Sequence, residues 1–328
     1  MKQYVGLDVS QDQTSICVVD ESGRVLWQGK CASTPEAIAA TLSSKAPEAE
    51  RMESGPLSIW LCHGLTALGL PVVCLDARHA QAALKLQLNK SDANDARGLI
   101  VRTGWYREVA VKGLDGQLVR ALITARAQLV ALRVDLGNQI RGILKPFGLL
   151  AGKGVGKTFA EKVRSLVPDS PLHDVVEALL RSWEAINKEV ATLSRRLVTE
   201  ARQGDTVCRL MTAPGVGVLV ALTYVSTIGD PARFPHSSSV GAYIGLTPRR
   251  FQSGETDYTG KISRCGDRLT RTYLYEAAGI ILNRVSRWST LKAWGTRLAR
   301  KLAIILHRIW RDGTEFRWSN KEVAVTAP

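Results

Sequence analysis

The sequence predicts an α/β domain over residues 1–112, a helical coiled-coil arm over 113–200 and a mainly helical domain over 201–328. Three observations predict this organisation. Short apolar runs alternate with helical segments in the first part, two heptad repeats dominate the second, and basic helical segments fill the third. With 328 residues, of which 45% are hydrophobic, the chain can bury about two globular cores, which excludes wholesale disorder.

The first part alternates strand and helix signals. Residues 5–9 (VGLDV) alternate apolar side chains with Gly6 and Asp8, and this period of two predicts a strand. The same criteria predict strands at 16–19 and 25–27 joined by a turn at 21–23, a helix at 35–42, a weak strand at 49–53, a helix at 57–68, a strand at 72–75, and helices at 77–88 and 91–103. Strands that alternate with helices are typical of an α/β domain.

Two heptad seams follow. The first comprises Leu118, Leu122, Ala125, Leu129, Leu132, Leu136 and Ile143, and the second comprises Val176, Leu179, Trp183, Ile186, Val190, Leu193 and Leu197. Two heptad helices joined by a loop predict an antiparallel helical hairpin or coiled coil. A bundle inside one domain is the alternative to an arm that dimerises or carries a basic tip, and the length of each seam favours the arm.

The loop between the seams contains GKGVGKT at residues 152–158, which resembles a phosphate-binding P-loop. Three residues separate Gly152 from Gly156, where that motif needs four, and the segment follows a helix rather than a buried strand. We therefore predict a flexible basic loop instead of a nucleotide site.

The distribution of charge indicates a polyanionic partner. The first hundred residues carry 9 basic and 11 acidic side chains, whereas the remainder carry 35 and 19. This excess favours nucleic acid over a membrane surface. The uncharged segment 211–229 contains proline and glycine, and is predicted to be a turn that leads into a buried helix rather than a membrane span.

The cysteines indicate a reducing compartment. None of the six lies within ten residues of another, so we predict free thiols and a cytoplasmic protein. Cys62, His63, Cys74 and His79 are zinc-ligand types, but their spacing fits no compact zinc module. Core thiols and surface histidines are the better interpretation.

Four acidic residues in the first part suggest a metal site. Asp8 lies inside the first strand, Glu53 follows a short strand, and Asp92 and Asp95 share a helix face at a spacing of three. Converging carboxylates repel one another unless a cation lies between them, and oxygen-only ligands suit Mg²⁺ or Mn²⁺. Two such ions about 4 Å apart would activate a nucleophile at a phosphodiester. A surface or helix-capping role is the alternative for Asp92 and Asp95.

These residues and their neighbours resemble the RuvC-like, RNase H-like domain of the DEDD transposases of bacterial insertion sequences. The resemblance rests on GLDVS at 6–10, ESGP at 53–56 and KSDANDAR at 90–97. It continues with PGVG at 214–217, which resembles the family's helix-hairpin-helix turn, and with GLTPRRFQSG at 245–254 and GKISRCGD at 260–267. That family includes the Piv invertase and serine recombinases guided by a bridge RNA.

The resemblance implies a role for each matched residue. Asp8, Glu53, Asp92 and Asp95 correspond to the metal-binding carboxylates, and Ser253 corresponds to a serine nucleophile that bonds covalently to DNA. It also implies donor and target DNA, a structured guide RNA, and a homo-oligomer (a dimer or a pair of dimers) with a composite site. A plain turn residue is the alternative for Ser253.

The basic residues of the C-terminal signature are predicted nucleic-acid contacts. They are Arg249, Arg250, Lys261 and Arg264. Paired arginines suit phosphate oxygens, although a solvated pair is the alternative.

Two other functions compete with a DNA recombinase. GLDVS followed by a hairpin resembles the phosphate-binding hairpin of sugar-kinase-like or actin-like ATPases, but residues 116–328 contain no second acidic, glycine-rich hairpin. A catalytically inactive nucleic-acid-binding protein is the other alternative. Hydrolysis of ATP that depends on Asp8 would favour the first, and absence of DNA cleavage with Mg²⁺ would favour the second.

Overall fold

A computed structural model describes residues 3–43, 49–53, 57–75, 108–154, 156–168, 171–286 and 298–318. The chain forms two compact units, residues 1–112 and 113–328, which are treated separately below. The predicted helices at 77–88 and 91–103 lie outside the described residues.

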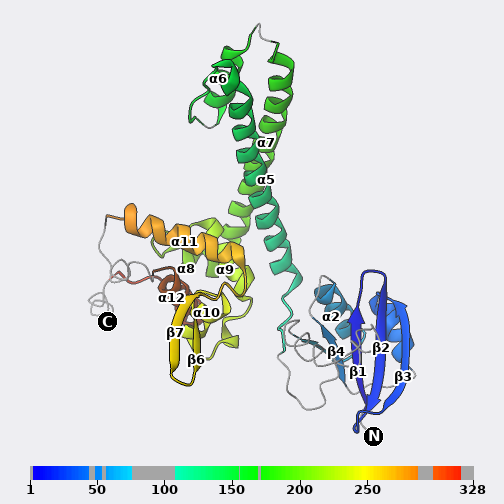
Figure 1. The fold of residues 1–328 in the computed structure, drawn as a ribbon. Helices are drawn as coiled ribbons and strands as arrows, with labels where there is room; N and C mark the ends of the chain where they lie inside the picture. The colour runs from blue at the N-terminus through cyan, green and yellow to red at the C-terminus, as the bar shows by residue number, and fades with distance from the viewer. Residues whose placement is uncertain are drawn as a thin grey trace. The chain divides into compact units, whose positions relative to one another are not determined.

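The first unit is built on a five-stranded sheet (Figure 1). Its strands are β1 (Gln3–Val9), β2 (Gln13–Asp20), β3 (Val25–Ala32), β4 (Ala49–Glu53) and β5 (Val72–Leu75), and its described helices are α1 (Pro35–Leu42) and α2 (Ser58–Ala67). The strand order is β3-β2-β1-β4-β5, with an antiparallel β1–β2–β3 meander beside the parallel strands β1, β4 and β5. This order is that of an RNase H-like sheet, so the predicted fold of the first domain is confirmed.

Local sequence explains these elements. Val5 and Leu7 are fully buried in a core shared with Ile38 of α1 and Leu61 of α2, so the apolar face of β1 lies against the helices. Thr34 caps α1 by accepting a hydrogen bond from the Ala37 N–H, and Pro35 occupies the first helical position, where a missing N–H costs nothing.

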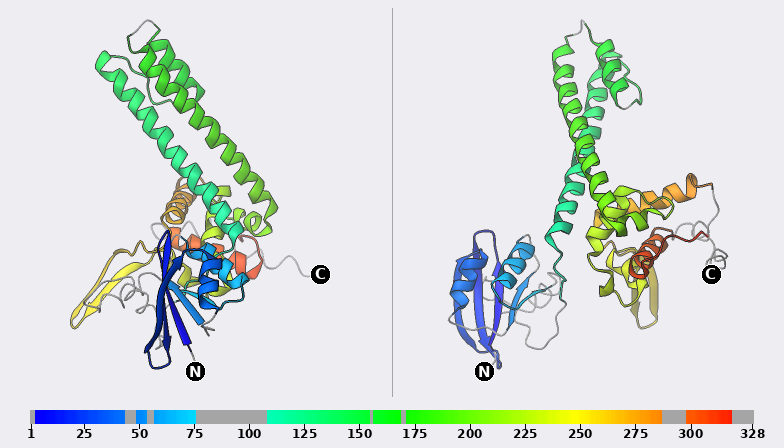
Figure 2. Two further views of the ribbon diagram at one scale, coloured as in Figure 1. Left: turned by 90° about the vertical axis from the view of Figure 1, so that its right-hand side faces the viewer. Right: turned by 180° about the vertical axis from the view of Figure 1, so that it is seen from behind.

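The second unit begins with a helical hairpin, here called the arm (Figure 1). It consists of α5 (Leu114–Leu144), the 3₁₀ helix η1 (Lys145–Phe147), α6 (Lys157–Leu166) and α7 (His173–Gln203). Figure 2 shows α5 and α7 side by side along their lengths, with α6 at the far end. The hairpin of long helices is as predicted, and α7 begins at His173.

The buried face of α5 differs from the predicted seam. Leu118 and Leu132 are 51% and 42% exposed, whereas Ile123 and Ile140 are buried. The apolar side chains of α5 cover more of the helix surface than a single heptad seam would. The seam that packs against α7 is displaced around the helix from the predicted seam. The seam prediction was therefore wrong for three of its seven members, Leu118, Ala125 and Leu132, and α5 leaves an apolar stripe exposed there.

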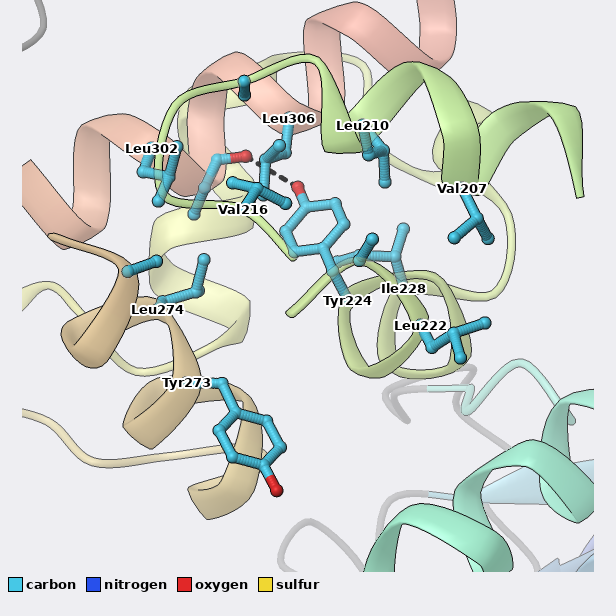
Figure 3. Packing of buried hydrophobic residues seen from close by; sticks show 14 of the residues in the cluster. Val207, Leu210, Val216, Leu222, Tyr224, Ile228, Tyr273, Leu274, Leu302 and Leu306 are labelled. Carbon is cyan, nitrogen blue, oxygen red and sulfur yellow. Dashed lines mark hydrogen bonds between the residues drawn. The ribbon is translucent and has the colours of Figure 1, made fainter. Parts of the chain in front are cut away.

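The remainder of the second unit is a helical domain with one hairpin of strands. Its elements are α8 (Asp205–Met211), α9 (Val218–Ile228), η2 (Pro231–Arg233), α10 (Ser237–Tyr243), β6 (Pro248–Ser253), β7 (Thr256–Ile262), α11 (Arg268–Asn283) and α12 (Leu298–Asp312). The core gathers leucine, isoleucine and valine side chains around Tyr224, whose hydroxyl donates to the Ala303 carbonyl at 2.6 Å (Figure 3).

The uncharged segment 211–229 therefore supplies a turn and a buried helix, as predicted. Of the described helices, none has both the length and the apolar content needed to cross a membrane.

Candidate functional site

Asp8 lies next to the carboxyl end of β1, the central strand of the sheet. Leu7 is in register with Met52 of the parallel strand β4, so Asp8 and Glu53, each one residue further on, follow at the same level of adjacent strands. Neighbouring strands lie about 4.8 Å apart, so the two backbone positions are close. The sheet thus places two of the four predicted acidic positions together.

The alternation of β1 puts Asp8 on the face opposite the helices. Leu7 points into the core with α1 and α2, and successive side chains of a strand point to opposite faces. Asp8 is partly buried there, opposite Ser15 of β2. A carboxylate at this place faces away from the apolar core, which fits a ligand-binding role better than a packing role.

The other two predicted acids, Asp92 and Asp95, lie outside the described residues. Among the residues that the structure does describe, no three His, Cys, Asp or Glu side chains form a metal-binding cluster. Cys62 and Cys74 are buried in the first unit, where a mutual hydrogen bond and burial raise the pKa of the Cys62 thiol. They are core thiols, as predicted.

Ser253 ends strand β6, beside the two-residue turn of an exposed hairpin. Ser253 pairs with Thr256 across Gly254 and Glu255, and Gly254 has a positive φ of 56°. Glycine at the first central position is typical of a type II′ hairpin turn. Every residue of β6 and β7 is exposed to solvent, and the hairpin projects from the helices of its unit (Figure 2). The Ser253 hydroxyl is therefore accessible to a large substrate.

An aromatic pair shares the face of the hairpin that carries Ser253. Phe251 and Tyr258 are register partners, their rings stack with centroids 5.4 Å apart, and they are 52% and 58% exposed. Phe251 is two residues before Ser253, about 7 Å along the strand on the same face. The sequence did not predict this pair, because no strand was predicted there and the pairing of Phe251 with Tyr258 depends on the register of the hairpin.

The predicted basic contacts have different environments. Arg249, Lys261 and Arg264 line an exposed groove of about 550 Å³ at the base of the hairpin, and the Arg249 guanidinium donates to the Ser263 carbonyl at 3.1 Å. Arg250 also borders the groove, but it forms a two-pronged ion pair with Asp257. This pair holds the pKa of the Asp257 carboxyl below its ordinary value.

Strand alternation puts Arg250 on the face opposite Ser253. Arg250 thus points away from the face that carries Ser253, whereas Arg249 lies at an irregularity of the β6–β7 pairing, where alternation does not fix the direction of its side chain.

The base of the hairpin is rigid because two loops interlock there. Gly245 and Gly266 both have positive φ, and a Cβ on either would collide with backbone atoms of the opposite loop. The Arg271 side chain donates to the carbonyls of Ile244, Cys265 and Gly266 at 3.0, 2.8 and 3.1 Å. These contacts orient the hairpin relative to α10 and α11.

Asp267 links the hairpin base to the root of the arm. Its carboxylate accepts from the Thr270 N–H at 2.6 Å, which caps α11, and it also forms an ion pair with Arg120 of α5. Arg120 further donates to Thr227 of α9 at 3.2 Å. Burial acts to raise the pKa of Asp267, but the hydrogen bonds from Thr270 and Arg120 outweigh burial and hold this pKa below its ordinary value.

We expect Asp267→Asn to destabilise the second unit by about 1–3 kcal/mol at neutral pH, because Arg120 loses its anionic partner in a half-buried setting. The folded-state pKa lies below the unfolded value of about 3.9. The stabilisation is therefore present above that value and is lost as the pH falls through the folded pKa. Thermal unfolding of both proteins at neutral pH and in acid checks this.

The matched control is Asp257→Asn, which removes the exposed partner of Arg250 and should change the melting temperature less. An Asp267→Asn protein as stable as the parent at neutral pH would contradict the assigned link.

The predicted helix-hairpin-helix turn lies between α8 and α9. Gly215 has a positive φ, and a Cβ there would meet the Ala277 carbonyl of α11 at 2.6 Å, so the turn packs closely on that helix. Gly217 precedes α9 and has open space around the position of a Cβ. The turn thus connects α8 to α9 and packs on α11, the helix that follows the hairpin that carries Ser253.

Comparison with known proteins identifies two matching segments. Residues 5–148 match a family of DEDD transposases of the IS110 type, and residues 208–293 match the Transposase IS116/IS110/IS902 family. The first segment contains all four predicted carboxylates, and the second contains Ser253.

Full-length relatives agree with these segments. The transposase for insertion sequence element IS1111A of Coxiella burnetii is 26% identical over 298 residues, which cover 89% of this chain and 81% of the relative. The transposase for insertion sequence element IS1328 of Yersinia enterocolitica is 24% identical over 335 residues, covering 95% and 98%. Among solved structures, T. thermophilus RuvC in complex with a Holliday junction substrate matches 33% of this chain and 100% of its own, at 14% identity and a TM-score of 0.26.

Proposed function

Because the chain belongs to the IS110 family of DEDD transposases, we propose that it cuts and rejoins DNA for an insertion sequence through a metal-bound acidic site and a covalent serine–DNA intermediate. The acidic site is on the sheet of the first unit, and the serine is on the hairpin of the second. The observation that carries the proposal is the placement of Ser253 at the exposed end of a rigid hairpin, beside an aromatic pair and a basic groove.

In the proposed reaction the Ser253 hydroxyl attacks a DNA phosphorus. A bond forms between Oγ and phosphorus, the hydroxyl proton leaves, one bridging P–O bond breaks, and the released sugar oxygen takes up a proton. Attack by the hydroxyl of another strand reverses these changes and restores the free serine. The number of phosphoester bonds is conserved, so rejoining needs no energy source.

The acidic residues fit a hard divalent cation. Asp8 and Glu53 follow at one level of adjacent strands, and carboxylate oxygens are the ligands that Mg²⁺ and Mn²⁺ prefer. We propose that Asp8, Glu53, Asp92 and Asp95 hold the metal. When bound, such an ion stabilises negative charge that develops on the phosphoryl oxygens.

On the hairpin, Phe251 and Tyr258 would support a DNA base next to the attacked phosphate, while Arg249, Lys261 and Arg264 contact neighbouring phosphates. Stacking on aromatic side chains is independent of base identity, because every base has a π-face. The hairpin would thus hold a locally unpaired strand without choosing its sequence.

We expect Phe251→Ala with Tyr258→Ala to weaken productive substrate binding by about 1–3 kcal/mol, the usual contribution of one stacked base. The rings are half exposed and outside the core, so the fold should remain intact. The measurement is the KM and kcat for cleavage of an element end, with the effect expected in KM. A matched control is Tyr275→Ala, which removes a more exposed tyrosine on α11.

The proposed partners are donor DNA, target DNA and a structured guide RNA. The basic excess of residues 101–328 supports a nucleic-acid partner and fits RNA and DNA equally. Sequencing the nucleic acid that copurifies with the protein tests the guide. A discrete RNA encoded beside the gene supports it, and its absence favours direct readout of DNA.

We also propose a homo-oligomer, formed through the exposed apolar stripe of α5. Leu118 and Leu132, two heptads apart, are both on this stripe. We expect Leu118→Glu with Leu132→Glu to lower the particle mass in light scattering, with little loss of stability because both side chains are already exposed. Leu150→Glu, at an exposed leucine of the arm loop, is the control. An unchanged mass would place the interface elsewhere.

Two alternatives have less support. Both matched segments belong to transposases, so an ATPase is not proposed. Residues 5–148 match a DEDD transposase, which is inconsistent with the predicted membership of the serine recombinases. The serine nucleophile is therefore proposed as part of a DEDD transposase. A strand-exchange assay with the cognate element ends and Mg²⁺ separates the proposed enzyme from an inactive nucleic-acid-binding protein.

A further inference from the structure

The far end of the arm contains a pocket that the proposed reaction does not use. It has a volume of about 540 Å³, and residues of α5, the loop before α6, and α7 line it. Its lining includes Arg133 and Arg141 of α5, Lys153 of the loop, and Asn187 of α7, with the buried rings of Phe159 and Trp183 behind them. Cavities of roughly 300–1,000 Å³ are typical of ligand sites.

Arg141 builds one wall of this pocket. Its Nε donates to the Gly152 carbonyl at 2.9 Å and its Nη2 donates to the Gly154 carbonyl at 2.7 Å. The guanidinium also lies over the Phe159 ring, 4.5 Å from the centroid. Arg141 thereby holds the glycine-rich loop against α5, so Lys153 is presented from a fixed loop.

The pocket has an excess of positive charge. Three cationic side chains line it, and none of the described lining residues is a carboxylate. Within the part of the chain that the structure describes, Arg133 donates to a neutral acceptor, the Asn187 amide oxygen, at 3.4 Å. By contrast, Arg164 at the same end of the arm is neutralised by Glu177 and Glu184. Like charges that converge without an acid favour a bound anion.

We propose that this pocket binds a phosphodiester group of a nucleic-acid strand, with Arg133 and Lys153 as the phosphate contacts. A nucleic-acid partner is inferred from charge, because the excess positive charge of the chain lies outside its first hundred residues. Arg133 and Arg141 lie 13 and 21 residues beyond Arg120, or about 20 and 30 Å along the helix. The arm would therefore extend the nucleic-acid footprint well beyond the Ser253 hairpin.

This site is independent of the chemistry at Ser253. It orients a strand and forms no bond, so it stands even if the serine assignment is wrong. Binding is measured with the full chain in the absence of divalent metal, where no cleavage contributes to the signal.

A pair of matched charge reversals tests the proposal. Lys153→Glu changes a pocket residue, and Lys162→Glu makes the same change at an exposed lysine of α6 outside the pocket. Affinities for a single-stranded RNA and a DNA duplex of equal length are measured over a range of salt concentrations. We expect Lys153→Glu to weaken binding several-fold and to reduce the salt slope by about one, the loss of one phosphate contact. Lys162→Glu should leave the slope unchanged.

The two polymers distinguish the source of the phosphate. A loss confined to RNA assigns the pocket to RNA, a loss confined to DNA assigns it to DNA, and a loss for both shows a shared backbone contact. Equal behaviour of Lys153→Glu and Lys162→Glu with both polymers overturns the proposal. Thermal unfolding confirms that each variant is folded.

Crosslinking supplies a readout that does not depend on affinity. A photoreactive residue at Val134, which lines the pocket, should crosslink to the strand, whereas one at Val175 of α7, exposed and outside the pocket, should not. Crosslinks of equal yield at the two positions would argue against a specific site.

Discussion

Replacing Ser253 by alanine is expected to abolish strand exchange, with a loss of at least about a thousandfold, because no other group takes over a covalent nucleophile at the same place. The side chain is exposed at the end of β6, so its removal leaves no cavity and the fold should be unchanged. The measurement is recombination between cognate element ends, together with trapping of the protein–DNA adduct under denaturing conditions. The adduct should form with the parent protein and be absent with Ser253→Ala.

Thr256 provides the matched control for this experiment. It is the register partner of Ser253 and is exposed, and strand alternation puts its hydroxyl on the same face of the hairpin. Thr256→Ala should therefore retain most of the activity. If Ser253→Ala recombined at the parent rate, or if the adduct formed without it, Ser253 would be a turn residue and the nucleophile would lie elsewhere.

Asp8→Asn is expected to reduce DNA cleavage by at least about a hundredfold. The amide has nearly the shape of the carboxylate but lacks its charge, so it binds a hard cation poorly, and metal stabilisation is worth several kcal/mol. Binding of Mn²⁺, measured directly, should weaken in parallel with activity. Affinity for DNA without metal should stay close to that of the parent, since the basic contacts lie in the second unit.

Asp12→Asn is the control for charge, because Asp12 is an exposed carboxylate in the turn that follows β1. It should retain both metal binding and cleavage. Full cleavage by Asp8→Asn would remove the metal role of Asp8, while a loss of cleavage with unchanged Mn²⁺ binding would assign Asp8 a different role in the site.

Much of the first domain follows from sequence alone. The alternation in residues 5–9 predicts a strand with an apolar face, and the structure buries Val5 and Leu7 while Asp8 occupies the other face. The helix at 35–42 has the predicted bounds because its start is encoded locally by Thr34 and Pro35. Even the weak strand at 49–53 forms, since the neighbouring strands β1 and β5 supply hydrogen bonds on both sides.

Which side chains contact one another across the tertiary structure could not be predicted in the same way. The wide apolar surface of α5 admits more than one seam, and α7 covers a line that leaves Leu118 exposed. Arg249 and Arg250 are equivalent in sequence, but in the structure Arg250 is paired with Asp257, whereas Arg249 donates to the Ser263 carbonyl. The stacking of Phe251 on Tyr258 depends on the hairpin register.

By itself, then, the sequence determined the order and type of the described elements of the first domain, the long helices of the arm, and the positions at which acidic, hydroxyl and basic side chains occur, whereas it did not predict the strands β6 and β7. Only the tertiary structure decided which side chains meet, as Arg120 meets Asp267 across 147 residues to tie the arm to the base of the hairpin. The physical reason is the separation along the chain over which each kind of interaction acts. Periodicity, caps and turns are interactions between near neighbours in the chain, whereas ion pairs, stacking and buried seams depend on where distant segments are brought together.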